Sequence, residues 1–327
     1  SQMADVDGDG TPEALVFTLA ETLSIFDTAT GERKLLFDVD AQPNTPNVAD
    51  LTHSSLRPNM FTVWGPKAKG PAEVAFFPHY DYGRIILGDE PRYQKITYPN
   101  TMRSAKYAFQ VPDVTGDGQP ELGLVGIYGL QFGVMPSDAP LDDGVFGKYV
   151  MAAPMTGYNS GNMELQLYWG GGVVRNAAGE WLGMVAINPG GLDYCTHPGF
   201  KPAWSHFHHP ANRCFTLADL DGDGTPEILV GRVDGCVVAY SASDGKVVAR
   251  AMLDGELRSL VAYGNGAIAG TAHGLFLLGP DLRPVARRPG GVEDIALLPQ
   301  PGQEPIVAAV LSDGRVVAVR VKAAARQ

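Results

Sequence analysis

Hydrophobic positions along this chain come in short runs that suit β-strands. The runs are rich in β-branched and aromatic residues and end at Gly, Asp-Gly or Pro, as at 13–18 (EALVFT), 227–232 (EILVGR) and 236–241 (CVVAYS). Over no long segment do apolar residues recur at the three- and four-residue spacing of an amphipathic helix. The pattern therefore predicts an all-β protein of short strands joined by tight turns.

The runs repeat with a common outline. Residues 230–240 (VGRVDGCVVAY) resemble residues 309–319 (AVLSDGRVVAV), and each segment has the form of a strand, a short turn and a second strand. A third strand often follows, as in 241–253 (SASDGKVVARAML). The Asp-Gly pairs at 234–235 and 313–314 suit tight hairpins, because glycine reaches positive φ without a steric penalty.

Hairpin-rich units of this length predict a β-propeller, in which blades of about four strands surround a channel. We expect one domain over 1–327 with seven blades, and six or eight blades are the alternatives. A linear solenoid of the same units is the competing architecture. The expected blades cover 3–45, 46–105, 106–213 as two blades with long loop insertions, 214–254, 255–289 and 290–322.

Charge and hydropathy restrict the partners. The chain has 36 acidic and 25 basic residues, for a net charge of −11, whereas nucleic-acid binding needs clustered Lys and Arg. No apolar run approaches the roughly 18 residues that a membrane helix needs. We therefore expect no nucleic-acid partner and no membrane span.

Eleven of the 36 acidic residues lie in three segments that align without gaps. These are 5–16 (DVDGDGTPEALV), 113–124 (DVTGDGQPELGL) and 219–230 (DLDGDGTPEILV). Calcium prefers six to eight oxygen ligands, and oxygens at positions 1, 3 and 5 of such a loop can converge when glycines let the backbone curl. A carbonyl at position 7 and a carboxylate at position 9 can complete the sphere. The pattern predicts about three structural Ca²⁺ sites, with plain Asp-Gly turns as the alternative.

The position of the last acid excludes an EF-hand. An EF-hand has its bidentate Glu at position 12 and helices on both sides, but position 12 here is Val16, Leu124 or Val230, inside a strand. The three loops instead resemble the calcium β-hairpins of the FG-GAP/VCBS repeat family, found in integrin α-subunit propellers.

The resemblance implies a ligand set for each loop. Because Thr115 has no charge where the other loops have Asp, we expect the second site to bind calcium most weakly. The implied ligands, with the residue at position 7 acting through its carbonyl, are Asp5, Asp7, Asp9, Thr11 and Glu13; Asp113, Thr115, Asp117, Gln119 and Glu121; and Asp219, Asp221, Asp223, Thr225 and Glu227.

A second cluster of candidate ligands lies in 195–214 (CTHPGFKPAWSHFHHPANRC). A disulfide between Cys195 and Cys214 would close a long loop. Alternatively, Cys195, His197, Cys214 and one of His206 or His208 suit a tetrahedral Zn²⁺ site. The sequence leaves both interpretations open, together with a third in which neither bond forms.

A polysaccharide lyase needs a Tyr or His base and a cation that neutralises a uronate carboxylate. Candidates for these roles are Tyr80, Tyr82, Arg84, His206 and His208. The competing interpretation is that they are ordinary packing or loop residues.

The leading functional hypothesis is a calcium-stabilised extracellular propeller that serves as a binding or assembly module for protein or glycan. It would be secreted or on the cell surface, with the periplasm as an alternative, and it could belong to a larger surface assembly. The alternative is a carbohydrate-active enzyme, a polysaccharide lyase, in which Tyr80, Tyr82 or Arg84 would share one cleft with His206 or His208.

Overall fold

The structure is a computed structural model of the 327-residue chain. Its described residues contain strands and turns and no helix, and so no helix there is long and apolar enough to cross a membrane. The ranges that the structure describes are 2–17, 22–38, 61–64, 71–76, 82–96, 105–111, 121–126, 132–135, 170–188, 190–197, 201–207, 210–300 and 303–321.

The described strands form seven antiparallel sheets, five with four strands and two with three. Two compact units divide the chain. Unit 1 comprises 1–173, 184–186 and 195–202, and unit 2 comprises 174–183, 187–194 and 203–327.

Three sheets lie wholly in unit 1, and each is a meander of neighbouring strands. Their first strands lie in sequence, β1 beside β5 and β5 beside β9. The strands are β1 (Gln2–Ala4), β2 (Glu13–Phe17), β3 (Thr22–Phe26) and β4 (Arg33–Asp38); β5 (Phe61–Trp64), β6 (Glu73–Phe76), β7 (Tyr82–Ile86) and β8 (Arg92–Ile96); and β9 (Ala105–Val111), β10 (Glu121–Gly126) and β11 (Phe132–Met135).

One sheet has strands with residues in both units, and three more lie wholly in unit 2. The shared sheet is β12 (Gly170–Arg175), β13 (Trp181–Asn188), β14 (Gly191–Thr196) and β15 (Lys201–Phe207). The sheets of unit 2 are β16 (Asn212–Ala218), β17 (Glu227–Arg232), β18 (Cys236–Tyr240) and β19 (Val247–Met252); β20 (Leu257–Tyr263), β21 (Gly266–Thr271), β22 (Gly274–Leu278) and β23 (Pro284–Pro289); and β24 (Val292–Gln300), β25 (Gln303–Leu311) and β26 (Val316–Arg320).

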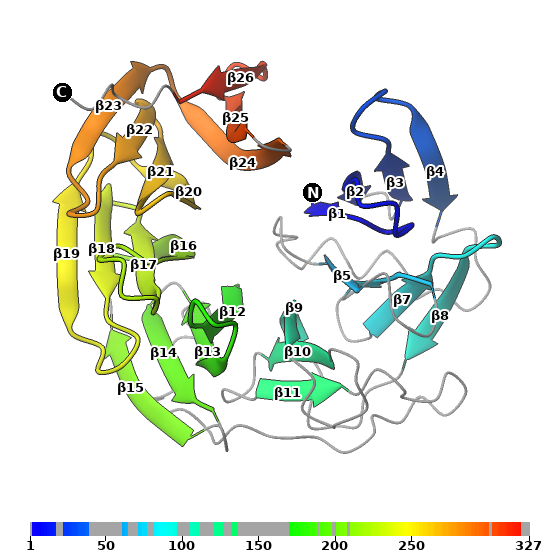
Figure 1. The fold of residues 1–327 in the computed structure, drawn as a ribbon, viewed down its shortest axis with the longest axis horizontal. Coiled ribbons are helices and arrows are strands. Elements are labelled where there is room, and N and C mark those ends of the chain that lie inside the picture. Colours follow the sequence, from blue (N-terminus) through cyan, green and yellow to red (C-terminus); the bar gives the residue numbers. More distant parts are fainter. Residues whose placement is uncertain are drawn as a thin grey trace. The chain divides into compact units, whose positions relative to one another are not determined.

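Within unit 2 the sheets stack through their first strands. β16 lies beside β20 and β20 beside β24, while β19 and β23 are the outer strands of their sheets (Figure 1). Burial follows this order: every residue of β18 is buried, whereas β19 is exposed at four of six positions and β23 at all six. The inner strands therefore build the core, and the outer strands present an edge to solvent.

Each unit has its own apolar core between successive sheets. The core of unit 1 joins the β1–β4 and β5–β8 sheets through fully buried residues such as Leu15, Leu23, Val74 and Ile85. In unit 2, one cluster around Leu229 and Leu257 joins the β16–β19 and β20–β23 sheets. Burial of this kind stabilises a fold by roughly 25 cal/mol per Å² of apolar surface removed from water.

Candidate metal centres

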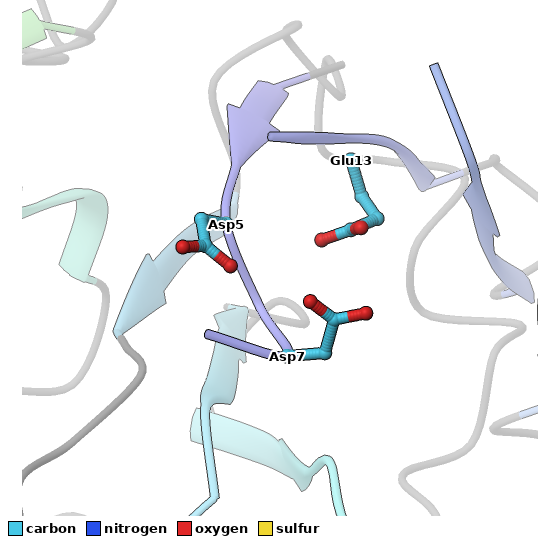
Figure 2. A group of neighbouring side chains, drawn as sticks. All are labelled: Asp5, Asp7 and Glu13. Carbon is cyan, nitrogen blue, oxygen red and sulfur yellow. The ribbon is translucent and has the colours of Figure 1, made fainter. Parts of the chain in front are cut away.

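The first acidic loop connects β1 to β2 and gathers three carboxylates. Oxygens of Asp5, Asp7 and Glu13 all lie within 4.8 Å of one another, and Figure 2 shows the three side chains facing a common space. Glu13 is the first residue of β2 and is buried, with 1% of its surface exposed. A closely spaced set of carboxylate oxygens is the donor chemistry that a hard divalent cation prefers.

Backbone hydrogen bonds hold this loop in its curled form. Asp5 Oδ1 accepts from the N–H of Gly8 at 2.7 Å, and its Oδ2 accepts from the N–H of Gly10 at 3.0 Å. Both glycines have positive φ, 80° and 87°, which lets the chain turn around the aspartate. Glu13 Oε2 accepts from the N–H of Val6 at 3.0 Å, so the last acid also closes the loop on itself.

A lysine from another strand enters the first loop. Lys34, on β4, places its Nζ 2.8 Å from Glu13 Oε1, 3.0 Å from Asp7 Oδ2 and 3.5 Å from Asp27 Oδ2. Hydrogen bonding to Glu13 and then to Asp7 raises the pKa of Lys34. The same lysine lowers the pKa of Asp7. The first loop therefore contains a cation of its own.

The third acidic loop, between β16 and β17, repeats this geometry. Asp219, Asp221 and Glu227 bring oxygens within 4.8 Å of one another. Asp219 accepts from the N–H groups of Gly222 and Gly224 at 2.8 and 3.0 Å, and Glu227 Oε2 accepts from the N–H of Leu220 at 2.8 Å. The two loops thus make the same hydrogen bonds at equivalent positions.

The electrostatics of the third loop differ from those of the first. Among the residues that the structure describes, no Lys or Arg forms an ion pair with Asp219, Asp221 or Glu227. Burial raises the pKa of Glu227, and the charges of Asp221 and Asp223 raise it further. Within the described part of the chain, no cation compensates the repulsion between the carboxylates of this loop.

Turns from both neighbouring sheets contact the third loop. Ala177, in the turn between β12 and β13, donates its N–H to the carbonyl of Gly224 at 2.6 Å. On the other side, a Cβ added at Gly222 would lie 3.6 Å from Nδ2 of Asn265, in the turn between β20 and β21. The loop therefore lies between turns of the sheets before and after its own.

Not every predicted ligand joins these clusters. The carboxylates of Asp9 and Asp223 each accept the N–H of the threonine two residues later, Thr11 or Thr225, at 2.6 Å. The clusters therefore contain positions 1, 3 and 9 of the motif. In the second loop, Glu121 begins β10 and its side chain is not described, while Asp113, Thr115, Asp117 and Gln119 lie outside the described residues.

Comparison with known proteins shows the fold. The chain aligns with the crystal structure of BBS1N in complex with ARL6DN at a TM-score of 0.67 and 11% identity, covering 96% of this chain and 88% of that one. It aligns with Sqt1 from Saccharomyces cerevisiae at a TM-score of 0.65 and 10% identity, covering 98% and 84%. The fold is a β-propeller.

This result confirms the all-β propeller prediction, and the seven described sheets are its blades. At these identities the similarity shows the fold alone. No family model matches the chain, and no curated protein matches it. The FG-GAP/VCBS resemblance of the loops therefore stays a prediction.

All three cysteines are free thiols in the structure, so the disulfide between Cys195 and Cys214, one of the interpretations that the sequence leaves open, is not formed. Cys195 lies in β14 and Cys214 in β16, and burial raises the pKa of the Cys214 thiol to about 12. Burial also lowers the pKa of His197. Within the described ranges the two acidic clusters are the only groups of three or more potential metal ligands, and the zinc site, whose candidate ligand His208 lies outside those ranges, stays a prediction.

His206 takes part in packing between the β12–β15 sheet and the β16–β19 sheet. Its ring stacks on Tyr240 with centroids 4.6 Å apart, and its Nε2 lies 2.7 Å from the carbonyl oxygen of Gly245. Trp204, two residues earlier on β15, donates its indole N–H to the carbonyl of Ala242 at 3.1 Å. These contacts fasten β15 to the turn between β18 and β19.

The other lyase candidates cannot be placed beside His206. Tyr80 and His208 lie outside the described residues. Tyr82 and Arg84 belong to β7, but the structure describes only their backbone. The shared cleft that a lyase would need stays a prediction from the sequence.

The sequence pattern did not identify Lys34, the residue that brings a positive charge into the first loop. It lies 21 residues after Glu13 and reaches the loop only because β4 pairs with β3 and β3 with β2. Its signal in the sequence is a lysine next to the apolar run Leu35, Leu36 and Phe37 of a predicted strand.

Proposed function

We propose that this propeller is a binding module that accepts an extended segment of a partner protein along its outer strand β19. The observation behind the proposal is a row of exposed apolar side chains on that strand. Val247, Val248 and Met252 are 55%, 53% and 60% exposed. Large apolar side chains grouped on a sheet edge are typical of interaction surfaces.

The backbone of β19 can bond an added strand. Leu253 donates its N–H to the carbonyl of Gly235 at 2.9 Å. This bond shows which residues of β19 form hydrogen bonds with β18 and which lie between them. In an antiparallel pair every second residue bonds its partner, and the residues between them direct their N–H and C=O outward. By this alternation the outward residues of β19 are Arg250 and Met252, and Val248 lies unpaired at the register shift of the strand. A partner strand would add main-chain hydrogen bonds there and cover the two apolar side chains.

The charged residues of β19 and its flanks indicate the composition of the partner segment. Between residues 245 and 253 the chain has Lys246 and Arg250 and no carboxylate, within a chain of net charge −11. Lys246 is already paired with Asp244 at 2.6 Å, so Arg250, whose side chain also hydrogen-bonds Cys236, is the remaining cation of this segment. We infer that the segment alternates apolar and acidic residues.

The outer strand of the next blade is a poorer template. β23 begins and ends with Pro284 and Pro289, and proline has no N–H to donate. Arg287 on this strand is engaged by Asp254 at 2.7 Å. A protein partner also agrees with BBS1N, a protein of the same fold whose structure was determined in complex with ARL6DN.

Calcium would support this module by stabilising the third loop. The residues fit the ion, because Asp219, Asp221 and Glu227 offer closely spaced carboxylate oxygens. The equivalent acidic cluster in the first loop already binds a cation, the ammonium group of Lys34. A bound Ca²⁺ would neutralise carboxylates that otherwise repel. An extracellular or periplasmic setting and a glycan ligand stay predictions from the sequence.

The binding proposal is tested with a synthetic peptide of alternating valine and glutamate, titrated into the full chain while backbone amide shifts are followed by NMR. We expect the largest shifts at Val248, Arg250 and Met252. Arg250→Glu should weaken binding by about tenfold, because it replaces an attraction by a repulsion. Arg288→Glu makes the same charge change on β23 and should leave the affinity unchanged. Equal losses in both variants, or no shift along β19, would refute the proposal.

The calcium proposal has a separate test, a thermal melt in Ca²⁺ and in EGTA. We expect Ca²⁺ to raise the melting temperature of the wild type, because an ion that binds only the folded state stabilises it by mass action. Asp219→Asn should reduce that rise. Identical melts of the wild type in Ca²⁺ and in EGTA would rule out calcium stabilisation.

A further inference from the structure

The blades that contain the first and third loops differ at a position on their fourth strands. Both blades pair their third and fourth strands with the same shift in register. In the first blade Phe26 pairs with Arg33 and Ile25 with Leu35, which leaves Lys34 in the bulge. The equivalent pairs in the fifth blade, Tyr240 with Val247 and Ala239 with Ala249, leave Val248 in the bulge. Lys34 and Val248 are therefore structural equivalents.

A second difference accompanies the first. The residue that follows the third strand is Asp27 in one blade and Ser241 in the other, and both donate their N–H across the same turn. Asp27 contributes a carboxylate 3.5 Å from Lys34 Nζ. At these two positions the first blade has a lysine and an acid that pairs with it, whereas the fifth blade has Val248 and Ser241.

We propose that Lys34 is the resident cation of the first loop, so that this loop folds without calcium, whereas the third loop needs a divalent cation. The inference rests on the calcium role proposed for the third loop. It assigns opposite metal requirements to two loops of almost identical sequence.

The ammonium group of Lys34 and a calcium ion cannot occupy the first loop at the same time. The carboxylate oxygens of the first loop lie within 4.8 Å of one another, and Lys34 Nζ already lies within 3.0 Å of two of these residues. An ammonium group is a compact charge with three donors, and here it meets three carboxylates. A calcium ion in the same cluster would lie against it and be repelled, so it could bind only after the lysine had left.

Burial also favours the resident lysine. Glu13 is 1% exposed, so its charge needs a partner inside the folded blade. Lys34 supplies that partner from the same sheet, through β3 and β4, at any calcium concentration. Glu227, the equivalent acid of the third loop, is also buried, but the position equivalent to Lys34 holds Val248.

The experiment counts bound calcium per chain by equilibrium dialysis and calorimetry on the full chain. Asp5→Asn and Asp219→Asn remove the same ligand from the two loops and form a matched pair. Lys34→Val and Val248→Lys exchange the two bulge residues. Val248 is 53% exposed, so a lysine at that position fits without disturbing the core.

We expect Asp219→Asn to lose one calcium ion relative to the wild type and Asp5→Asn to lose none. Lys34→Val should gain one ion that a second substitution, Asp5→Asn, removes. Val248→Lys should lose the ion of the third loop. A loss of calcium from Asp5→Asn alone would overturn the inference, because it would show that the first loop binds metal with Lys34 in place.

The two proposals fail in different ways. If the wild type and Asp219→Asn bind the same number of ions, the calcium role of the third loop is wrong. If Asp219→Asn loses an ion but neither exchange variant changes the count, that role holds and the inference about Lys34 is wrong. Should Lys34→Val fail to fold, the comparison of Asp5→Asn with the wild type and the Val248→Lys variant still decide the question.

Discussion

Gly245 lies directly against the indole of Trp204, so that a Cβ atom added at Gly245 would be 2.7 Å from Cδ2 of the ring. Gly245 also has a φ of +69°, a conformation that side chains rarely adopt. Gly245→Ala should therefore destabilise the protein by about 1–3 kcal/mol through overpacking, in addition to the backbone strain. Urea unfolding measures the loss.

A matched control separates the two causes. Gly314 has a similar φ of +83°, but a Cβ there would meet nothing within 4 Å. Gly314→Ala therefore reports the backbone strain alone. Equal losses for the two variants would mean that the contact with Trp204 adds nothing.

Thiol reactivity should show that Cys214 is protonated at physiological pH. Burial raises its pKa to about 12, so the reactive thiolate becomes abundant only as the pH approaches that value. We expect slow alkylation of Cys214 in the native protein at pH 8 and fast alkylation in guanidinium, measured by peptide mapping. A mass two hydrogens lower, with a Cys195–Cys214 peptide, would instead restore the disulfide.

Acid should weaken a surface cluster in the sixth blade. Hydrogen bonds from His273 and then from Arg287 lower the pKa of Asp254 below its usual 3.8. The stabilisation from a carboxylate with a lowered pKa is present above its unfolded pKa and is lost as the pH falls through the folded value. Asp254→Asn should flatten the fall in melting temperature below about pH 4. If the difference in melting temperature between the wild type and the variant stayed constant down to pH 2, the prediction would be contradicted.

The second loop, at 113–121, gives a prediction from the sequence. Thr115→Asp adds the carboxylate that the other two loops have at position 3 and should tighten calcium binding by about tenfold, since ligand charge tunes affinity. Calorimetry follows the change. Thr115→Ser keeps an uncharged hydroxyl and should bind as the wild type does. Equal affinities for Thr115→Asp and Thr115→Ser would show that charge at this position is unimportant.

The sequence was sufficient for the fold class because strand runs and turns are local. The run at 236–241 contains β18, and the Asp-Gly pair before it gives Gly235 its positive φ of 85°. The convergence of Asp219, Asp221 and Glu227 was equally predictable, because all three belong to one loop.

Features that depend on strand order could not be predicted. Lys34 reaches Glu13 across two strand pairings, which no local pattern encodes. Nor does the apolar run at 247–252 reveal that β19 is an outer strand, since Val248 and Met252 are the residue types of a buried core. The packing of Trp204 on Gly245 joins two blades and is invisible for the same reason.

The contacts of the third loop with both neighbouring turns have a mechanical consequence. Ala177 bonds the loop from one side and Asn265 abuts it from the other, so three successive blades meet at this loop. A force that pulls the turn at 176–179 away from the turn at 263–266 would act on the contacts of this loop first. It would act on the hydrogen bonds between the strands only afterwards. An ion bound there would link the three blades. The force needed to separate them would then increase with the calcium concentration around the protein.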